Sequence, residues 1–321
     1  MSAPVRFTFV LPVHNGMPYI RRQIQSILEQ DYPHFNLVVL ENASTDGTRE
    51  FLETQKDPRV RICPADQFLS YDENWKRVLS VKKEKFLVCA MADDYYERNF
   101  LTEIVSLINR HPHANVYRTN VKIVYQTEEN IQYPLQIPAE ITFESYIRGR
   151  LLKTYFETFQ GYCFKSDFFD KTWPTIPTNG GMASDEILVL SAFVDNVLPV
   201  SPCYACAYRL HGQNTSHTAQ AERVQQGLQN LYRWILAQKN QKANKIIQKY
   251  LPYFLEHRSD LSAQMMLWYE KNIYPLFQVK AGRRLPLFHY IRKHFFLHKN
   301  GPVVRFRFGP LKIKKIRKKG F

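Results

Sequence analysis

Two adjacent carboxylates, Asp93 and Asp94, follow a short apolar run at residues 86–90. That run is typical of a buried strand, because charged residues precede it and turn-forming residues follow it. In an open α/β sheet, ligands bind just beyond the carboxyl ends of the strands. Two acids placed there can bind a hard divalent cation and, through it, a diphosphate. The alternative is that the pair only solvates a turn or caps the next helix.

Further polar clusters follow other predicted elements. Pro12, His14 and Asn15 come at the end of a strand at residues 6–13, and the segment 41–48 follows a strand at residues 35–40. Asp185 begins a predicted helix, and the polar segment 208–214 comes after it. Each cluster alone could be an ordinary turn, a helix cap or a surface histidine. Their order along the chain favours a single shared site.

The elements that would position these clusters alternate in the first half of the chain. Strands are predicted at residues 6–13, 35–40, 60–62 and 86–90, and helices at 18–30, 49–55, 72–81 and 100–110. Strands that alternate with short helices predict an α/β doubly wound sheet. Neither a G-x-G-x-x-G motif nor a phosphate-binding Walker loop follows the first strand.

The rest of the chain divides near residue 218. Residues 115–217 mix strand-like segments (115–125, 162–165) with helix-like segments (143–153, 186–194), whereas the chain from residue 219 onward has helical periodicity. We therefore expect a domain at 1–217 and a helical C-terminal region at 218–321 that ends in a basic tail.

Three segments together carry a resemblance to a known family. VLPVHNG at residues 10–16, ILEQDYPHFNLVVLENASTDGT at 27–48 and SYDENWKRVLSVKKEKFLVCAMADD at 70–94 resemble the nucleotide-sugar half of a family 2 glycosyltransferase. The resemblance covers residues 5–110 and continues more weakly through 164–166, 184–185 and 208–216. It implies the GT-A fold, with a doubly wound mixed sheet, and an inverting transfer of sugar from a nucleotide diphosphate.

The resemblance also implies which positions would bind the donor. The residues after the first strand would contact the nucleoside, those after the second would lie by the base or near its pocket, and one on the third helix would line the site. In chain order, the donor-binding positions are Pro12, His14, Asn15, Glu41, Asn42, Asp46 and Asn74.

The remaining roles implied by the resemblance belong to the reacting groups. Asp93 would hold the ribose, and Asp94 would bind Mn²⁺ or Mg²⁺ at the diphosphate, where His211 would help to hold the metal or the diphosphate. Asp185 matches the catalytic base. These roles fit the chemistry, because a departing diphosphate needs a cation and an attacking hydroxyl needs a carboxylate to accept its proton.

The chain departs from the family pattern at three places. Met91 stands where an acid usually lies two residues before Asp93, and Glu41 is followed by Asn42 instead of a second acid. The second change leaves the nucleotide open, although we favour a UDP-sugar. Ser184 replaces an acid before Asp185, so Glu186 is a rival for the role of base.

Charge is concentrated at the C-terminus. Residues 271–321 contain 15 Lys and Arg and no Asp or Glu, so the preceding residues carry 29 basic and 29 acidic side chains. Aromatic and basic residues interleave over 283–321, a pattern that suits an anionic membrane surface and also suits nucleic acid. We favour the membrane, with a glycan or glycolipid acceptor such as lipopolysaccharide, capsule or a lipid-linked oligosaccharide. A non-catalytic scaffold and a nucleic-acid-binding protein are the alternatives.

Other features predict the compartment. The five cysteines form no disulfide framework, and Cys203-x-x-Cys206 lacks the second pair that a zinc site needs. With no secretory leader and no long apolar segment in the sequence, we expect a cytoplasmic protein, peripheral on the inner face of the membrane.

Overall fold

The computed structural model describes residues 3–125, 130–152, 154–155, 158–177, 183–212, 214, 221–256 and 263–279. The chain divides into two units, residues 1–281 and 282–321. The second unit, and with it the predicted membrane-binding segment 283–321, lies outside the described residues. So does the predicted boundary near residue 218.

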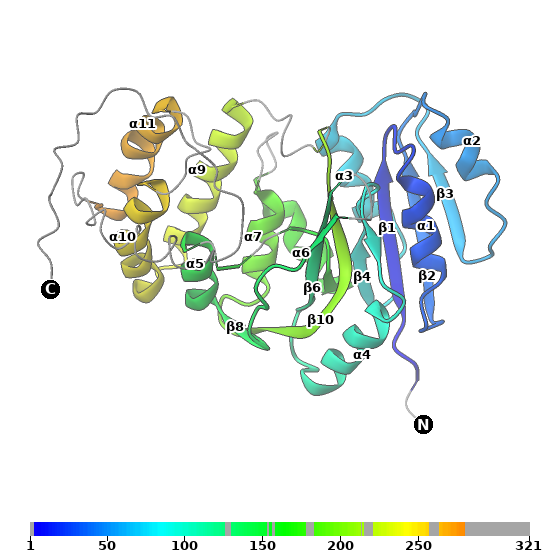
Figure 1. Ribbon diagram of the computed structural model, residues 1–321, viewed down its shortest axis with the longest axis horizontal. Coiled ribbons are helices and arrows are strands. Elements are labelled where there is room, and N and C mark those ends of the chain that lie inside the picture. Colours follow the sequence, from blue (N-terminus) through cyan, green and yellow to red (C-terminus); the bar gives the residue numbers. More distant parts are fainter. Residues whose placement is uncertain are drawn as a thin grey trace, which may run out of the picture. The chain divides into compact units, whose positions relative to one another are not determined.

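The first half of the chain forms the parallel part of a mixed sheet (Figure 1). Its four strands lie in the order β3-β2-β1-β4, and Phe7 pairs with Phe35 on one side and Phe86 on the other. The strands are β1 (Phe7–Val13), β2 (Phe35–Glu41), β3 (Val60–Pro64) and β4 (Phe86–Cys89). The helices between and after them are α1 (Ile20–Leu28), α2 (Thr48–Glu53), α3 (Tyr71–Ser80) and α4 (Phe100–Arg110). These elements confirm the predicted alternation of strands and helices.

The second half extends the sheet with strands of both directions. β9 (Tyr162–Lys165) is antiparallel to β4 and to β6 (Val116–Tyr125), and β10 (Val197–Leu210) is parallel to β6. Three short strands complete it: β5 (Tyr95–Tyr96), β7 (Asn130–Gln132) and β8 (Glu140–Thr142). The long strand β10 was not predicted. Pro199 and Pro202 obscure its alternation, and its pairing with β6 shifts register between Ser201 and Cys206.

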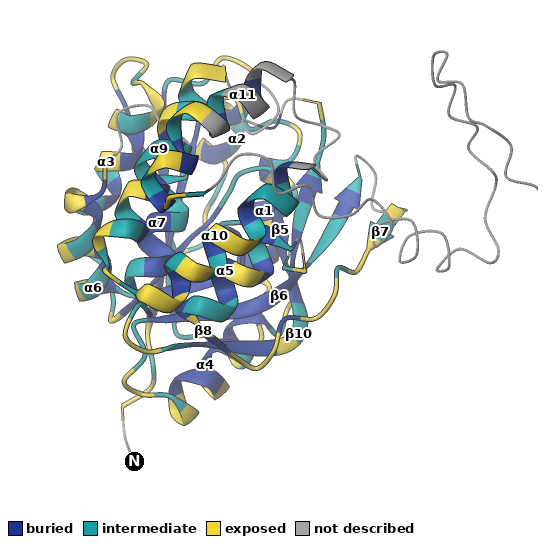
Figure 2. Cartoon of the chain, turned by 90° about the vertical axis from the view of Figure 1, so that its left-hand side faces the viewer, coloured by how far each residue is buried: buried dark blue, intermediate teal, exposed yellow. Residues whose placement is uncertain are grey.

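The two faces of the sheet bury separate cores. Phe7, Phe9 and Leu11 of β1 point into a core shared with α1 and α4, whereas Val10 points into the other core, as the two-residue period of a strand requires. The second core lies under α3, α5 (Phe143–Leu151), α6 (Ser166–Thr172) and α7 (Ser184–Ser191). Much of β6 and β10 is dark blue in Figure 2, whereas the outer surfaces of the helices, several loops and β7 carry exposed residues.

The C-terminal helices continue this second core. They are α9 (Ala221–Ala237), α10 (Gln241–Glu256) and α11 (Ala263–Asn272), followed by the 3₁₀ turns of η2 (Tyr274–Phe277). Leu231, Ile235, Ile247 and Leu251 are buried in the same cluster as Leu188 of α7. Helices therefore occupy much of residues 221–279, where the sequence has helical periodicity, whereas residues 280–321 of the predicted C-terminal region lie outside the described residues. Among the described helices, none combines the length and hydropathy needed to cross a bilayer.

Candidate functional site

A cavity of about 750 Å³ lies beyond the carboxyl ends of β1, β2 and β4, beside the end of β10; we call it the first cavity. Its wall brings together most of the residues that the sequence singled out. These are Pro12, His14, Asn15, Asn42, Asn74, Asp93, Asp94, Asp185 and His211. Asp185 and His211 come from the mixed second half of the chain. The polar clusters that follow the predicted strands therefore line one cavity.

Among the described residues that line the first cavity, two of the predicted donor-binding residues, Glu41 and Asp46, are absent. The Glu41 side chain is fully buried behind the loop, where Arg49 Nε donates to Oε2 (2.9 Å) and Ser44 N donates to Oε1 (2.6 Å). Burial acts to raise the pKa of Glu41, but the hydrogen bonds from Ser44 and Arg49 outweigh it, and the pKa is lowered. Glu41 is therefore an ionised side chain that stabilises the loop between β2 and α2 through its bonds to Ser44 and Arg49.

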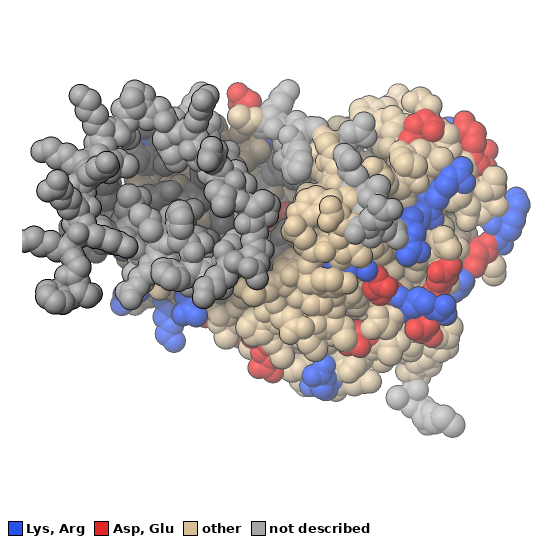
Figure 3. All heavy atoms as spheres, viewed as in Figure 1, with Lys and Arg blue, Asp and Glu red and all other residues tan. Residues whose placement is uncertain are grey.

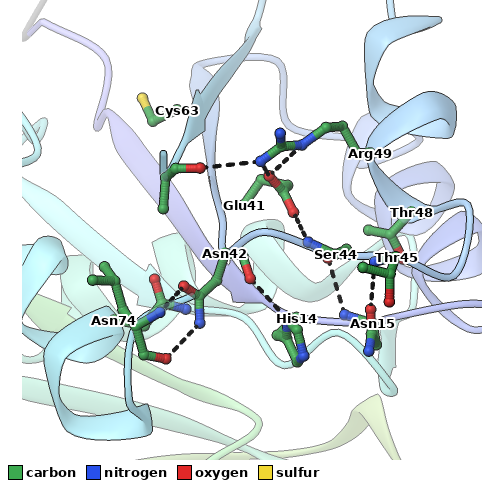
Figure 4. A network of polar contacts seen from close by, with 12 residues as sticks. His14, Asn15, Glu41, Asn42, Ser44, Thr45, Thr48, Arg49, Cys63 and Asn74 are labelled. Carbon is green, nitrogen blue, oxygen red and sulfur yellow. Dashed lines mark hydrogen bonds and ion pairs between the residues drawn. The ribbon is translucent and has the colours of Figure 1, made fainter. Parts of the chain in front are cut away.

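Asp46 joins the loop after β2 to the loop after β1. Its carboxylate accepts hydrogen bonds from Met17 N (2.8 Å) and Thr48 N (3.1 Å). Asn15 strengthens the same junction: its backbone N donates to Ser44 Oγ, and its side-chain Oδ1 accepts a hydrogen bond from Thr45 N (Figure 4). The Glu41 and Asp46 carboxylates are thus occupied in shaping the first cavity, and their contact with a nucleoside stays a prediction.

His14 and Asn42 hold the other end of this junction. His14 Nδ1 lies 2.7 Å from the carbonyl oxygen of Asn42, and the Asn42 side chain both donates to and accepts from the backbone of Leu69. α3 begins just after Leu69 with a capping box, in which Glu73 N donates to Ser70 Oγ and Ser70 N donates to Glu73 Oε2. This capped helix start fixes Asn74 in the wall.

Asp93 and Asp94 have different surroundings. Asp94 is 1% exposed, and its Oδ1 accepts a hydrogen bond from Arg209 N at 2.8 Å. Its buried Oδ2 has no hydrogen-bond partner among the described residues. Burial and the charge of Asp93 raise the pKa of the Asp94 carboxyl well above its usual range. Asp94 is therefore a buried carboxyl with an unsatisfied oxygen at the wall of the first cavity.

Asp93, by contrast, faces His211. Its Oδ2 lies 3.1 Å from His211 Nε2 and accepts a hydrogen bond from Asn214 Nδ2 at 3.1 Å. The family resemblance implies that His211 helps to hold the metal at Asp94 or the diphosphate, and that Asp93 holds the ribose. The structure instead brings His211 to Asp93, and the roles of all three residues stay predictions.

We tested whether these residues suit a divalent cation. Across the described ranges, no group of three or more His, Cys, Asp or Glu is arranged to hold a metal. However, the unsatisfied Oδ2 of Asp94 and the adjacent Asp93 carboxylate are oxygen donors of the kind that Mn²⁺ and Mg²⁺ prefer. A bound cation would also offset the cost of burying the Asp94 charge. The donor set therefore fits a hard divalent ion.

The structure separates Asp185 from its rival Glu186. Glu186 Oε1 accepts hydrogen bonds from Arg150 Nε (2.8 Å) and Tyr146 OH (3.2 Å), and this side chain lines a different cavity. Asp185 lines the first cavity, and its Oδ1 accepts a hydrogen bond from Glu186 N at 2.9 Å. Of the two acids, only Asp185 has a side chain in the wall that also holds Asp93.

Sequence reasoning missed the aromatic part of the wall. Phe68 packs against His14 with 4.7 Å between ring centroids, and Trp75 packs against Tyr71 and Phe159. Tyr19 contacts the ring of His211 at 4.8 Å. The aromatic density of the segment 68–75 is visible in the sequence and was the available signal. Asn214, which holds Asp93, had no comparable signal beyond its place in the polar segment after β10.

Comparisons of the sequence identify a family. A model of the family described as Glycosyl transferase family 2 matches residues 8–173. Among curated proteins, TuaG of Bacillus subtilis, named for teichuronic acid biosynthesis, is 19% identical over 145 residues, which is 44% of this chain and 57% of that protein. TarS of Staphylococcus aureus, a poly(ribitol-phosphate) beta-N-acetylglucosaminyltransferase, is 25% identical over 122 residues, 37% of this chain and 21% of that one. The matches thus span less than two thirds of either relative.

Solved structures confirm the predicted GT-A fold. Residues 1–349 of S. aureus TarS with UDP-GlcNAc superpose with a TM-score of 0.66 at 16% identity, over 86% of this chain and 81% of that one. The mannosyltransferase PcManGT of Pyrobaculum calidifontis, with GDP-Man and Mn²⁺, gives a TM-score of 0.53 at 18% identity, over 87% and 83%. At such identities the likeness establishes the fold alone.

Proposed function

We propose, because this chain belongs to glycosyl transferase family 2, that it moves a sugar with inversion from a nucleotide diphosphate to a hydroxyl of a surface glycan. One observation carries this proposal. The first cavity gathers Asp93, Asp94, His211 and Asp185 from segments that are far apart in the sequence, at the sheet edge where α/β folds bind ligands. A protein that served only as a scaffold would have no need for three acids and a histidine in the wall of one cavity.

The nucleoside would lie against the loops after β1 and β2. Those loops are tied by the hydrogen bonds of Asn15, Asp46 and His14, so their surface is already arranged before a ligand binds. Phe68 and His14 offer ring surfaces to a base. The neighbours named above hold UDP-GlcNAc and GDP-Man, which supports a nucleotide-sugar donor, and we favour a UDP-sugar.

The diphosphate would lie by Asp93, Asp94 and His211, which would hold Mn²⁺ or Mg²⁺. When bound, such a cation supplies the positive charge that stabilises a departing diphosphate. The protein residues orient that site: Arg209 N holds Asp94, and Asn214 and His211 hold Asp93. The Mn²⁺ in the mannosyltransferase neighbour supports this choice of ion.

Asp185 would act as the general base. An acceptor hydroxyl that attacks the anomeric carbon must lose a proton, and a carboxylate in the same cavity can accept it. Glu186 cannot serve without giving up its ion pair with Arg150. The new glycosidic bond forms as the bond to the diphosphate breaks, so no covalent sugar–protein intermediate is needed.

The basic C-terminus would hold the protein on the inner face of a membrane, close to a glycolipid acceptor. The excess of positive charge lies in the last 51 residues. Over the described face in Figure 3, basic and acidic side chains are intermingled, as their equal numbers before residue 271 predict. Attraction to anionic lipid would then come from the C-terminal segment and not from this face.

A donor panel tests the proposal. Hydrolysis or transfer is measured with UDP-, GDP- and dTDP-sugars, each with Mn²⁺ and with EDTA. We expect turnover of one nucleotide class, strongest for a UDP-sugar, and its loss in EDTA. If no sugar nucleotide binds or turns over under either condition, the chain is a non-catalytic member of its family and the proposal fails.

A further inference from the structure

A second cavity, of about 680 Å³, shares the first turn of α7 with the first cavity. Asp185 lines the first cavity and Glu186, the next residue, lines the second. The two side chains leave the same helical turn in different directions. A ligand in the second cavity that reaches Glu186 would therefore contact the residue that follows the proposed base, Asp185, in the sequence.

Most of the second cavity's wall is apolar. Aliphatic and aromatic side chains of α5, α9 and α10 form it, among them Leu151, Leu228, Leu231 and Phe254. A cavity of this size and lining is typical of a site for an apolar small molecule or chain. A saccharide alone would leave many of its hydroxyl groups against this apolar wall without hydrogen-bond partners.

The polar groups of the second cavity include a network beside Asp185. Arg150 donates to both oxygens of Glu186, at 2.8 and 3.2 Å, and Tyr146 OH donates to Oε1. The positive charge of Arg150 offsets the negative charge of Glu186, so this polar part of the wall carries no net charge. The arrangement suits an amphipathic ligand whose polar head lies near α7 and whose apolar part lies against α9 and α10.

Two large apolar side chains at the edge of the second cavity support an apolar ligand. Tyr133 is 61% exposed and Leu135 is 74% exposed, although both line the cavity. Tyr133 is held in place by an edge-to-face contact with Tyr204 (5.0 Å between centroids), and Tyr204 OH donates to the carbonyl oxygen of Pro134. These two side chains continue the apolar lining of the second cavity to its edge, where an apolar chain that enters it would contact them.

The elements that form this cavity lie largely outside the segment shared with the family. The family match ends at residue 173, whereas Val224, Leu228, Phe254 and Met265 belong to α9, α10 and α11. The second cavity is thus built in large part by helices outside the shared donor-binding segment. Such a place suits recognition of an acceptor.

We propose that the second cavity binds the apolar chain, alkyl or prenyl, of an amphipathic glycolipid acceptor and so places the acceptor's sugar hydroxyl at Asp185. This inference rests on the proposed function and adds to it the site that binds the apolar chain of a glycolipid acceptor. An acceptor that is a saccharide without an apolar chain is the competing result of the test.

Calorimetric titration of the full chain with two model glycosides tests the inference. Octyl β-D-glucopyranoside, used below its critical micelle concentration, is compared with methyl β-D-glucopyranoside, which has the same sugar and no chain. Burial of even part of the longer chain should make the octyl compound bind at least tenfold more tightly.

A matched pair of variants on α9 locates the binding. Val224→Trp puts a large ring into the second cavity, whereas Gln226→Trp puts the same ring on the exposed side of the same helix. We expect Val224→Trp to weaken octyl glucoside binding at least tenfold and Gln226→Trp to leave it unchanged. Leu228→Trp repeats the test at another lining position. Thermal unfolding and a UDP titration show that each variant is folded.

The outcomes separate the inference from the proposed function. If UDP binds the wild type but the two glycosides bind equally, or if Val224→Trp and Gln226→Trp affect octyl glucoside binding alike, the acceptor class is wrong and the donor assignment stands. If neither UDP, GDP nor dTDP binds the wild type, the proposed function fails, and the acceptor role fails with it.

Discussion

The imidazole of His211 and the carboxylate of Asp93 meet across the end of the sheet, with Nε2 and Oδ2 3.1 Å apart. They are 118 residues apart in the sequence. Their contact joins the loop after β4 to the end of β10, while Asn214 donates a hydrogen bond to Asp93 and the Tyr19 ring contacts His211. The diphosphate end of the proposed donor site depends on this junction.

Replacement of His211 by alanine should weaken UDP binding in the presence of Mn²⁺ by about tenfold, an effect of about 1.4 kcal/mol. The variant loses the ring that holds Asp93 and the contact with Tyr19. Calorimetric titration measures the change. His113→Ala, at an exposed position outside the first cavity, is the control and should bind as the wild type does. Equal affinity of the two variants would exclude a role for His211 in the donor site.

Asp94→Asn should remove the stabilisation by Mn²⁺ while leaving the fold intact. Asparagine keeps an oxygen for Arg209 N but loses the buried charge that a cation would neutralise. A ligand that binds the folded state raises the unfolding temperature by mass action. We expect Mn²⁺ to raise the midpoint of thermal unfolding of the wild type, and to raise that of Asp94→Asn much less. Equal shifts in both proteins would show that the ion binds elsewhere.

Glu41 should contribute to stability in a pH-dependent way. Its pKa is lowered in the folded protein, so its contribution is fully present above the unfolded value of 4.5 and is lost as pH falls through the folded value. Glu41→Gln should cost about 2 kcal/mol at pH 7, a modest figure because Arg49 is partly exposed.

Urea unfolding of the wild type and of Glu41→Gln between pH 7 and pH 3 measures this dependence. The difference in the free energy of unfolding should shrink toward zero at the acid end, because a protonated glutamate resembles glutamine. A difference that stays constant with pH would mean that the lost packing, and not the charge, causes the effect.

The basic tail should bind anionic vesicles through its charge. Replacement of the basic residues between positions 312 and 319 by glutamine removes six charges, each contributing about 1 kcal/mol near such a surface. Cosedimentation with vesicles that contain phosphatidylglycerol should fall sharply, and raised salt should have the same effect on the wild type. Strong binding of the wild type to vesicles without anionic lipid would contradict the electrostatic account.

Much of the fold follows from local sequence patterns. The apolar runs at 35–40 and 86–90 are bounded by polar segments, and each forms a buried strand within a residue of its expected limits. The helix at 100–110 ends before His111-Pro112, as expected. β10 could not be predicted in the same way, because its prolines and its register shift conceal a strand that is fixed by pairing with β6.

The site was predictable as a set of residues but not as a set of contacts. Patterns at strand ends locate Asp93, Asp185 and His211, yet which acid faces His211 depends on the position of β10 relative to β4. Likewise, the loop sequence cannot show that Glu41 is turned inward toward Arg49, because that direction is set by the burial of the last residue of β2.

The turnover of Asp185→Asn, set beside that of Glu186→Gln, tests the central claim most directly. With the sugar nucleotide that the panel selects, Asp185→Asn should bind the donor as the wild type does and lose at least a hundredfold in transfer rate, since it can no longer accept the acceptor's proton. Glu186→Gln should keep a rate within about tenfold of the wild type. Near-normal transfer by Asp185→Asn would contradict the assignment of the base and the mechanism built on it.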